Sequence, residues 1–260
     1  MPLVIQVGKE TDVKIPAEIK GSPVTGIGFG AFAGCTDVLS VNLNDSVTSL
    51  GDRAFGGCTG LVAVVIPNSV LSIGNRAFSG CISLASIVIP DTVNTIGFAA
   101  FQDTAWYDAQ PDGVVYAGKI AYEYKGDRSS ATNIEIIVGT EIIEEGLFSN
   151  CINLTTVLLP ESITKIERNA FSNCISLTSI TIPYSVTSVA TDSFATIRDP
   201  ITGIMSSERK SSWHSSFGGC NNLVSLIYKG RAYSAIIVGY LSNGDAQYDM
   251  PKAFYDDVNT

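Results

Sequence analysis

Apolar residues recur along the chain in blocks that share one internal spacing and one period. Each block contains a phenylalanine, usually in the phrase Ala-Phe-x-x-Cys, and these anchors are Phe32, Phe55, Phe78, Phe101, Phe148, Phe171 and Phe217. The successive steps between them are 23, 23, 23, 47, 23 and 46 residues. A step that is kept, or doubled to within one residue, is typical of identical units stacked in a line. The pattern therefore predicts a solenoid.

Each block contains two short apolar patterns that predict strands. The first, Leu-x-x-Ile-x-Ile-Pro, as at 61–67, alternates with period two, which favours a short strand with one buried face that ends at proline. The second, Ser-Val-x-x-Ile-Gly, as at 69–74, predicts another short strand or turn. The phenylalanine phrase is too short for more than one helical turn, and its ring is expected to fill the interior. With strands about 4.8 Å apart, about eight turns would form one parallel sheet about 40 Å long.

Two insertions interrupt the period. The first, residues 105–132, holds two β-rich runs around Ala117 and Gly118, which predict a tight β-hairpin projecting from the edge of the coil. The second, residues 195–216, is polar and predicts a long surface loop.

The whole chain, residues 1–260, is predicted to form one mostly β domain, because a repeat array lengthens without needing a second core. Its segments are a widened N-terminal turn at 1–34, repeats at 35–104 and 133–194, a last turn at 217–229 and a cap at 230–260. The cap loses the period and is expected to shield the last open edge, with a helix predicted over 233–241.

The cysteines occupy one position of the repeat, three residues after the phenylalanine. They are Cys35, Cys58, Cys81, Cys151, Cys174 and Cys220. Thr104 takes this position in the fourth block, and such a replacement suits a packing role better than metal ligation. We therefore predict buried free thiols, with a disulfide between adjacent turns or a metal site as the alternatives, although no C-x-x-C pair is present.

Composition and charge narrow the choice of partners. The net charge is −9, and the densest basic stretch is the pair Arg209 and Lys210. Nucleic acid is therefore not an expected partner, since phosphate binding needs clustered cations. The sequence contains no run of 18 apolar residues, so membrane insertion is not expected. Lys9, Glu10 and Asp12 occupy positions that would be apolar in a signal peptide.

Catalytic chemistry finds little support. His214 is the only histidine, and the serines beside it are merely neighbours in sequence. The glycines around Ile27 weakly resemble a phosphate-binding loop, but they belong to the Ile-Gly-x-x-Ala-Phe part of the repeat. Glu141, Glu144 and Glu145 form the only tight acidic group, which is more consistent with a surface turn than with a carboxylate pair. The sequence therefore predicts neither an enzyme nor a cofactor or metal site.

Two rows of side chains are predicted to point outward from the first strands. The row between the inward apolar residues is Asn42, Val65, Val88, Glu135, Leu158, Thr181 and Ile227. The row two residues earlier is Ser40, Ala63, Ser86, Asn133, Thr156, Ser179 and Ser225. Aligned exposed apolar residues often mark a partner surface, although β-propensity alone would also select valine and isoleucine there. Both interpretations stay open, and the first row is the candidate binding face.

Aromatic residues of the first insertion form a rival candidate site. They are Trp106, Tyr107, Tyr116, Tyr122 and Tyr124. These rings could present a stacking platform for a sugar or peptide, or they could pack the hairpin against the coil, as aromatic residues routinely do. Packing is the favoured interpretation.

The repeat text resembles the BspA-like leucine-rich repeats of bacterial and some protist surface proteins. The resemblance is carried by Ile-Pro-x-Ser-Val-x-x-Ile-Gly-x-x-Ala-Phe-x-x-Cys-x-x-Leu units at 35–104 and 151–194, by the segment from Ile15 to Cys35, and by the hairpin text 113–119. It implies a leucine-rich repeat solenoid that acts, without catalysis, as an adhesin-like module at the cell surface or in secreted form. Its ligand would be a host or matrix protein or glycan. The alternatives are a spacer within a larger protein and a cytoplasmic location.

Overall fold

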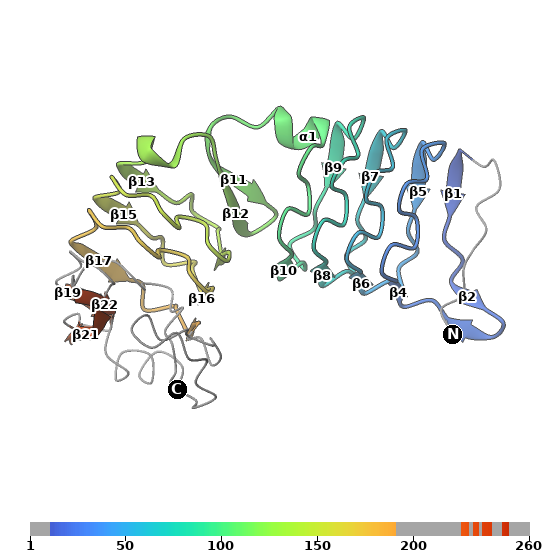
Figure 1. Cartoon of the computed structure of the whole chain (residues 1–260). Helices are drawn as coiled ribbons and strands as arrows, with labels where there is room; N and C mark the ends of the chain where they lie inside the picture. Colours follow the sequence, from blue (N-terminus) through green and yellow to red (C-terminus); the bar gives the residue numbers. More distant parts are fainter. Residues whose placement is uncertain (1–10, 191–224, 229–230, 234–235, 241–245, 250–260) are drawn as a thin grey trace, which may run out of the picture. The chain divides into compact units, whose positions relative to one another are not determined.

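The computed structural model describes residues 11–190 and four later strand segments, 225–228, 231–233, 236–240 and 246–249. The chain forms two compact units, Met1–Pro111 (unit 1) and Asp112–Thr260 (unit 2), each built from stacked turns (Figure 1). The prediction of a single domain stays a prediction. Phe217, Cys220, His214 and the whole second insertion lie outside the described residues.

Unit 1 contains two parallel sheets, one from each strand pattern of the repeat. The first sheet has the order β1 (Asp12–Lys14), β5 (Ser40–Asn42), β7 (Ala63–Val65) and β9 (Ser86–Val88). The second sheet has the order β4 (Gly26–Ile27), β6 (Ser49–Leu50), β8 (Ser72–Ile73) and β10 (Thr95–Ile96). A two-stranded hairpin, β2 (Glu18–Ile19) and β3 (Ser22–Pro23), widens the first turn, and α1 (Ala105–Asp108) follows β10. Equivalent residues of successive repeats are paired in register, as with Ala63 and Ser86.

Unit 2 repeats this arrangement with the inserted hairpin built in. Its second-pattern sheet has the order β11 (Gly113–Ala117), β12 (Ile120–Lys125), β14 (Ile142–Ile143), β16 (Lys165–Ile166) and β18 (Ser188–Val189). The first-pattern strands are β13 (Asn133–Glu135), β15 (Thr156–Leu158), β17 (Ser179–Ile182) and β19 (Ser225–Tyr228), with β20 (Arg231–Tyr233) antiparallel to β19. A 3-10 turn, η1 (Arg128–Ser130), links the hairpin to β13, and β21 (Ile236–Tyr240) pairs with β22 (Ala246–Asp249).

The hairpin is confirmed, but its predicted projection from the coil is wrong. β12 pairs in parallel with β14, so that Ala121 lies opposite Ile143. The hairpin therefore supplies the first two strands, β11 and β12, of the second-pattern sheet of unit 2. The physical reason is that Ile120, Ala121 and Tyr124 are apolar and become buried against the neighbouring turn.

Two further predictions about strands and helices are wrong. The expected continuous parallel sheet is divided, because among the described strands the first-pattern sheet of unit 1 ends at β9 and separate sheets begin at β13 and β17. The helix predicted over 233–241 is replaced by β21, whose sequence Ile-Ile-Val-Gly-Tyr is rich in β-branched and aromatic residues.

Stacked phenylalanine rings form the centre of each core, as predicted. In unit 1 the centroids of Phe32, Phe55, Phe78 and Phe101 follow one another at 5.2, 5.3 and 5.8 Å with nearly parallel planes. In unit 2 Phe148 and Phe171 stack at 5.4 Å. All these side chains are buried. Each ring fills its own turn and covers its neighbour, so the turns depend on one another for burial.

The phenylalanine phrase forms hydrogen-bonded turns, with left-handed backbone at two positions of each repeat. Two residues before the phenylalanine, the φ angles are 57° at Gly30, 53° at Arg53, 52° at Arg76, 54° at Ala99, 67° at Gly146 and 56° at Asn169. Two residues after it, the left-handed residues are Gly34, Gly57, Gly80, Asp103, Asn150 and Asn173. Glycine adopts this conformation without steric cost, and asparagine and aspartate tolerate it better than most residues.

The cysteine position is explained by packing and hydrogen bonding. All five described cysteines are free, and the thiols of Cys58 and Cys81 donate to the carbonyl oxygens of Phe32 and Phe55, each at 3.0 Å. Burial raises the pKa of the Cys151 thiol to about 11, and the neighbouring Cys174 adds to this. The Cys151 thiol therefore stays protonated at neutral pH. Thr104 is also fully buried, and its hydroxyl accepts from the N–H of Tyr107 as the N-cap of α1.

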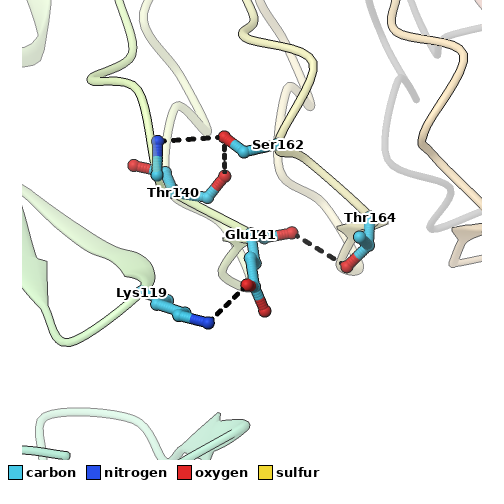
Figure 2. A network of polar contacts seen from close by, with 6 residues as sticks. Lys119, Thr140, Glu141, Ser162 and Thr164 are labelled. Atoms are coloured by element: carbon cyan, nitrogen blue, oxygen red, sulfur yellow. Dashed lines mark hydrogen bonds and ion pairs between the residues drawn. The ribbon is translucent and has the colours of Figure 1, made fainter. Parts of the chain in front are cut away.

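A column of Ser and Thr hydroxyls joins each turn to the one before it. The hydroxyl of Ser69 donates to the carbonyl of Val47 at 2.6 Å, and that of Ser162 donates to the carbonyl of Thr140 at 2.7 Å (Figure 2). Ser185 donates in the same way to Ile163. The serine of the Ser-Val phrase thus satisfies a backbone acceptor of the preceding turn.

Candidate interaction surface

The predicted binding row of unit 1 is exposed along its full length. Val65 and Val88 have 66% and 56% of their surface accessible, and Asn42 is also exposed. Their strand neighbours Val41, Val64 and Ile87 point into the core. Because these strands pair in register, Asn42, Val65 and Val88 form one straight row on a hydrogen-bonded sheet.

Unit 2 carries the second part of the predicted row, divided between its two first-pattern sheets. Leu158 is 57% exposed and Ile227 is 44% exposed, and Glu135 and Thr181 are exposed as well. β13 pairs with β15 so that Glu135 lies opposite Leu158, and β17 pairs with β19 so that Thr181 lies opposite Ile227. Each pair therefore places one polar and one apolar side chain side by side on the sheet surface.

A second row of small, mostly polar side chains runs beside each binding row. Its members with described surface are all exposed, and they are Ser40, Ala63, Ser86, Asn133, Thr156 and Ser179. Short side chains leave the sheet surface flat and keep the larger apolar residues accessible to another molecule. The resulting surface can bury apolar area against a partner while its hydroxyl groups offer hydrogen bonds.

The structure adds two residues to the rows that were not predicted. In β1, Lys14 lies opposite Asn42 and Asp12 lies opposite Ser40, whose hydroxyl donates to the Asp12 carboxylate at 2.6 Å. The signal was present in the sequence, because Ile15 and Pro16 match the Ile-Pro ends of later first strands at 66–67, 89–90 and 182–183. The binding row of unit 1 therefore begins with a cation and becomes apolar.

The aromatic residues of the insertion are mainly packing residues, which supports the favoured interpretation. Tyr122 and Tyr124 retain only 5% and 8% exposure. Trp106 lies edge-on to the Phe101 ring with centroids 5.1 Å apart, and it is half-buried with Tyr107. The hydroxyl of Tyr116 accepts from the N–H of Ile137 at 3.3 Å. Ile137 stands where Pro67, Pro90 and Pro160 stand in other repeats, so this tyrosine satisfies an N–H that those turns lack.

The acidic group of unit 2 separates into three environments. Glu141 forms an ion pair with Lys119 at 2.6 Å across the hairpin edge (Figure 2), and Glu145 is exposed. Glu144 replaces the glycine found at this position in unit 1, and one of its carboxylate oxygens is buried without a hydrogen bond. Burial raises the pKa of Glu144 to about 7, opposed by the N–H of Glu145 and reinforced by the charge of Glu167. Of the three acidic residues expected on a surface turn, Glu144 is thus the one with a buried carboxylate oxygen.

Within the described residues, no group of three or more His, Cys, Asp or Glu side chains is arranged to hold a metal ion. Among the helices of those same residues, none combines the length and hydrophobicity needed to cross a membrane.

Comparison with known families identifies the class of the protein. The family described as BspA type leucine rich repeat region matches six copies over residues 11–110 and 119–234. The chain therefore belongs to the BspA-type leucine-rich repeat family.

Several solved structures are similar to this chain. A leucine rich cell surface protein of Faecalibacterium prausnitzii is 29% identical over 92% of this chain and 54% of its own, with a TM-score of 0.40. A leucine-rich repeat protein of Bacteroides ovatus is 30% identical over 68% of this chain and 40% of its own, with a TM-score of 0.38. The T. pallidum leucine rich repeat protein is 26% identical over 65% of this chain and 79% of its own, with a TM-score of 0.37. The chain thus spans about half or less of the first two proteins. A search of curated protein sequences found no match.

Proposed function

We propose that the protein is a non-enzymatic binding module at the cell surface or in secreted form, which recognises a host or matrix protein or glycan through the first-pattern strands. The observation that carries the proposal is the exposed apolar pair Val65 and Val88, held in register on a sheet whose opposite face is packed into the core. Exposed apolar surface of this kind contributes free energy when a partner covers it.

The scaffold favours binding because the row is rigid before a partner arrives. Backbone hydrogen bonds and the stacked core fix the spacing of the row, so little conformational entropy is lost on association. Lys14 and Glu135 supply opposite charges at the N-terminal ends of the rows of the two units, which would orient a partner of complementary charge. Membership of the BspA-type family and the resemblance to a cell surface protein of F. prausnitzii support the proposed location.

The experiment compares charged substitutions on and off the row. Val65→Lys and Val88→Lys place cations on the proposed face, whereas Leu71→Lys changes a residue of similar exposure, 48%, that does not belong to the row. Binding of each purified variant is measured on a panel of extracellular-matrix proteins and mucin glycans. We expect the first two changes to reduce binding about tenfold or more, as loss of a central apolar contact does, and Leu71→Lys to leave it unchanged.

Two outcomes would count against the proposal. Binding that survives both row substitutions would move the partner to another surface. Absence of binding to the whole panel would favour the alternative function of a spacer in a longer protein. Protease treatment of intact source cells tests the location separately, because a surface protein is lost from the blot and a cytoplasmic protein is protected.

A further inference from the structure

A second exposed surface of unit 1 lies on the turns that follow the second-pattern strands. We call the residues Phe29, Arg53, Arg76 and Phe98 the turn patch. Phe29 and Phe98 stand at the same position of two repeats and are 77% and 72% exposed, the highest values among the exposed aromatic residues. Arg53 and Arg76 lie on the two turns between them and are also exposed. The patch is therefore a pair of cations flanked by two aromatic rings.

The backbone under the turn patch is fixed. The N–H of Arg53 donates to the carbonyl of Asn75, and the N–H of Arg76 donates to the carbonyl of Phe98, at 2.8 and 2.9 Å. Both arginines have left-handed backbone, where a side chain costs conformational energy and where other repeats have Gly30 and Gly146. The same turn position holds Ala99 and Asn169 in other repeats, so the turn forms without an arginine side chain, and the two guanidinium groups are not needed for the fold.

The arginine charges are available to a ligand. The nearest acidic side chain in sequence, Asp52, accepts hydrogen bonds from the backbone and side-chain N–H groups of Asn75, at 2.8 and 3.3 Å. Among the described residues, Arg53 and Arg76 form no ion pair. The guanidinium group of Arg76 lies over the Phe98 ring, 5.8 Å from the ring centroid. The patch thus combines cationic and aromatic surface that no acidic residue in the described part of the chain neutralises by an ion pair.

The spacing of the patch selects the shape of its ligand. Adjacent turns are about 4.8 Å apart, so the midpoint between the two arginines lies about 7 Å from each phenylalanine along the stack. An extended peptide rises about 3.3 Å per residue, so residues two positions on each side of a central residue lie about 6.6 Å from it. A central carboxylate would meet both guanidinium groups while apolar side chains on each side met Phe29 and Phe98.

From these observations we infer that the turn patch binds an extended acidic peptide in which an Asp or Glu is flanked, two residues away on each side, by large apolar residues. Carboxylate matches the planar donor fork of arginine, and aromatic rings bury apolar side chains effectively. This surface is distinct from the strand row, so the inference does not depend on the proposed function.

The test uses a labelled pentapeptide pool with Leu at positions one and five, Asp or Glu at position three and uncharged residues between, together with a matched pool carrying Asn or Gln at position three. We expect the acidic pool to bind the full chain about tenfold more tightly at low salt, and the difference to shrink as ionic strength rises. Arg53→Gly and Arg76→Gly should each weaken binding about fivefold, and Phe98→Ser should weaken both pools.

Arginine-to-glycine changes separate binding from folding, because glycine suits a left-handed backbone. The melting temperatures of Arg53→Gly and Arg76→Gly should equal or exceed that of the parent. Asn169→Gly, at the same turn position in unit 2, is the matched control and should leave peptide binding unchanged. Equal binding of the two pools, full binding by the double arginine variant, or binding of sulfated glycans but of no acidic peptide would each overturn the inference.

Discussion

At the scale of single residues, the position after the second-pattern strand shows how one side chain changes the chemistry of a turn. Unit 1 has Gly51, Gly74 and Gly97 there, whereas unit 2 has Glu144 and Glu167. Glu167 forms an ion pair with Lys165, but Glu144 has a buried carboxylate oxygen without a hydrogen bond. Glu144 is therefore expected to make the stability of unit 2 depend on pH.

The predicted direction follows from the raised pKa of Glu144. The folded protein binds a proton at this carboxyl up to a pH of about 7, whereas the unfolded chain releases it near its ordinary value of about 4.3. The contribution of this group to stability is therefore full below about pH 4 and is lost as pH rises through about 7. Glu144→Gln should be more stable than the parent at pH 8 by on the order of 2 kcal/mol, with little difference at pH 4.

Urea unfolding at both pH values measures this effect. Glu145→Gln is the control, since Glu145 is an exposed neighbour and its replacement should change stability little at either pH. If the difference in unfolding free energy between Glu144→Gln and the parent were the same at pH 4 and pH 8, burial would not disfavour the charged form of Glu144.

At the scale of elements, the repeat strands could be predicted closely and the insertion could not. The apolar alternation at 61–67 and the apolar Ile73 predicted the two strands of a repeat, and the same spacing recurs in the other repeats. The hairpin was visible in its two β-rich runs, but its docking on β14 was not, since a strand with apolar side chains can either project or pair. Likewise, the turn patch was missed because Phe29 and Phe98 look like ordinary members of an apolar repeat.

Close approach of adjacent second-pattern strands leads to a prediction for glycine. A Cβ at Gly74 would lie 2.5 Å from the backbone nitrogen of Asp52, and one at Gly28, in the first turn, would meet nothing within 4 Å. Gly74→Ala should therefore destabilise the protein by about 2–4 kcal/mol through backbone displacement. Gly28→Ala should change stability by less than about 0.5 kcal/mol. Chemical denaturation compares the two variants, and equal effects would contradict the tight contact at β6 and β8.

At the scale of the whole molecule, stability should be distributed turn by turn. Repeat arrays bury their apolar surface against immediate neighbours, so a lost contact acts locally before it acts globally. Phe78 stacks between Phe55 and Phe101 with no exposed surface, so Phe78→Ala should cost about 3–5 kcal/mol.

Hydrogen exchange locates that loss. In Phe78→Ala, amides of 49–101 should exchange faster, while those of β14, β16 and β18 in unit 2 keep their protection. Phe98→Ala removes an exposed ring of the same size and should leave the exchange pattern unchanged. Uniform acceleration throughout both units would show instead that the chain unfolds as one cooperative body.

The Ser and Thr hydroxyls that donate one turn back have a consequence for how such a chain changes over generations. Ser69 donates to the carbonyl of Val47 and Ser185 donates to the equivalent carbonyl of Ile163, and Thr92 donates in the same way to Val70, so several junctions between described turns use an equivalent hydroxyl donor and an equivalent acceptor. Removal or duplication of 23 residues within a run of repeats would rejoin matching partners, because the severed ends present interchangeable hydrogen bonds. Recombination between repeats of the gene can therefore lengthen or shorten the protein in whole turns while this column of hydrogen bonds is kept.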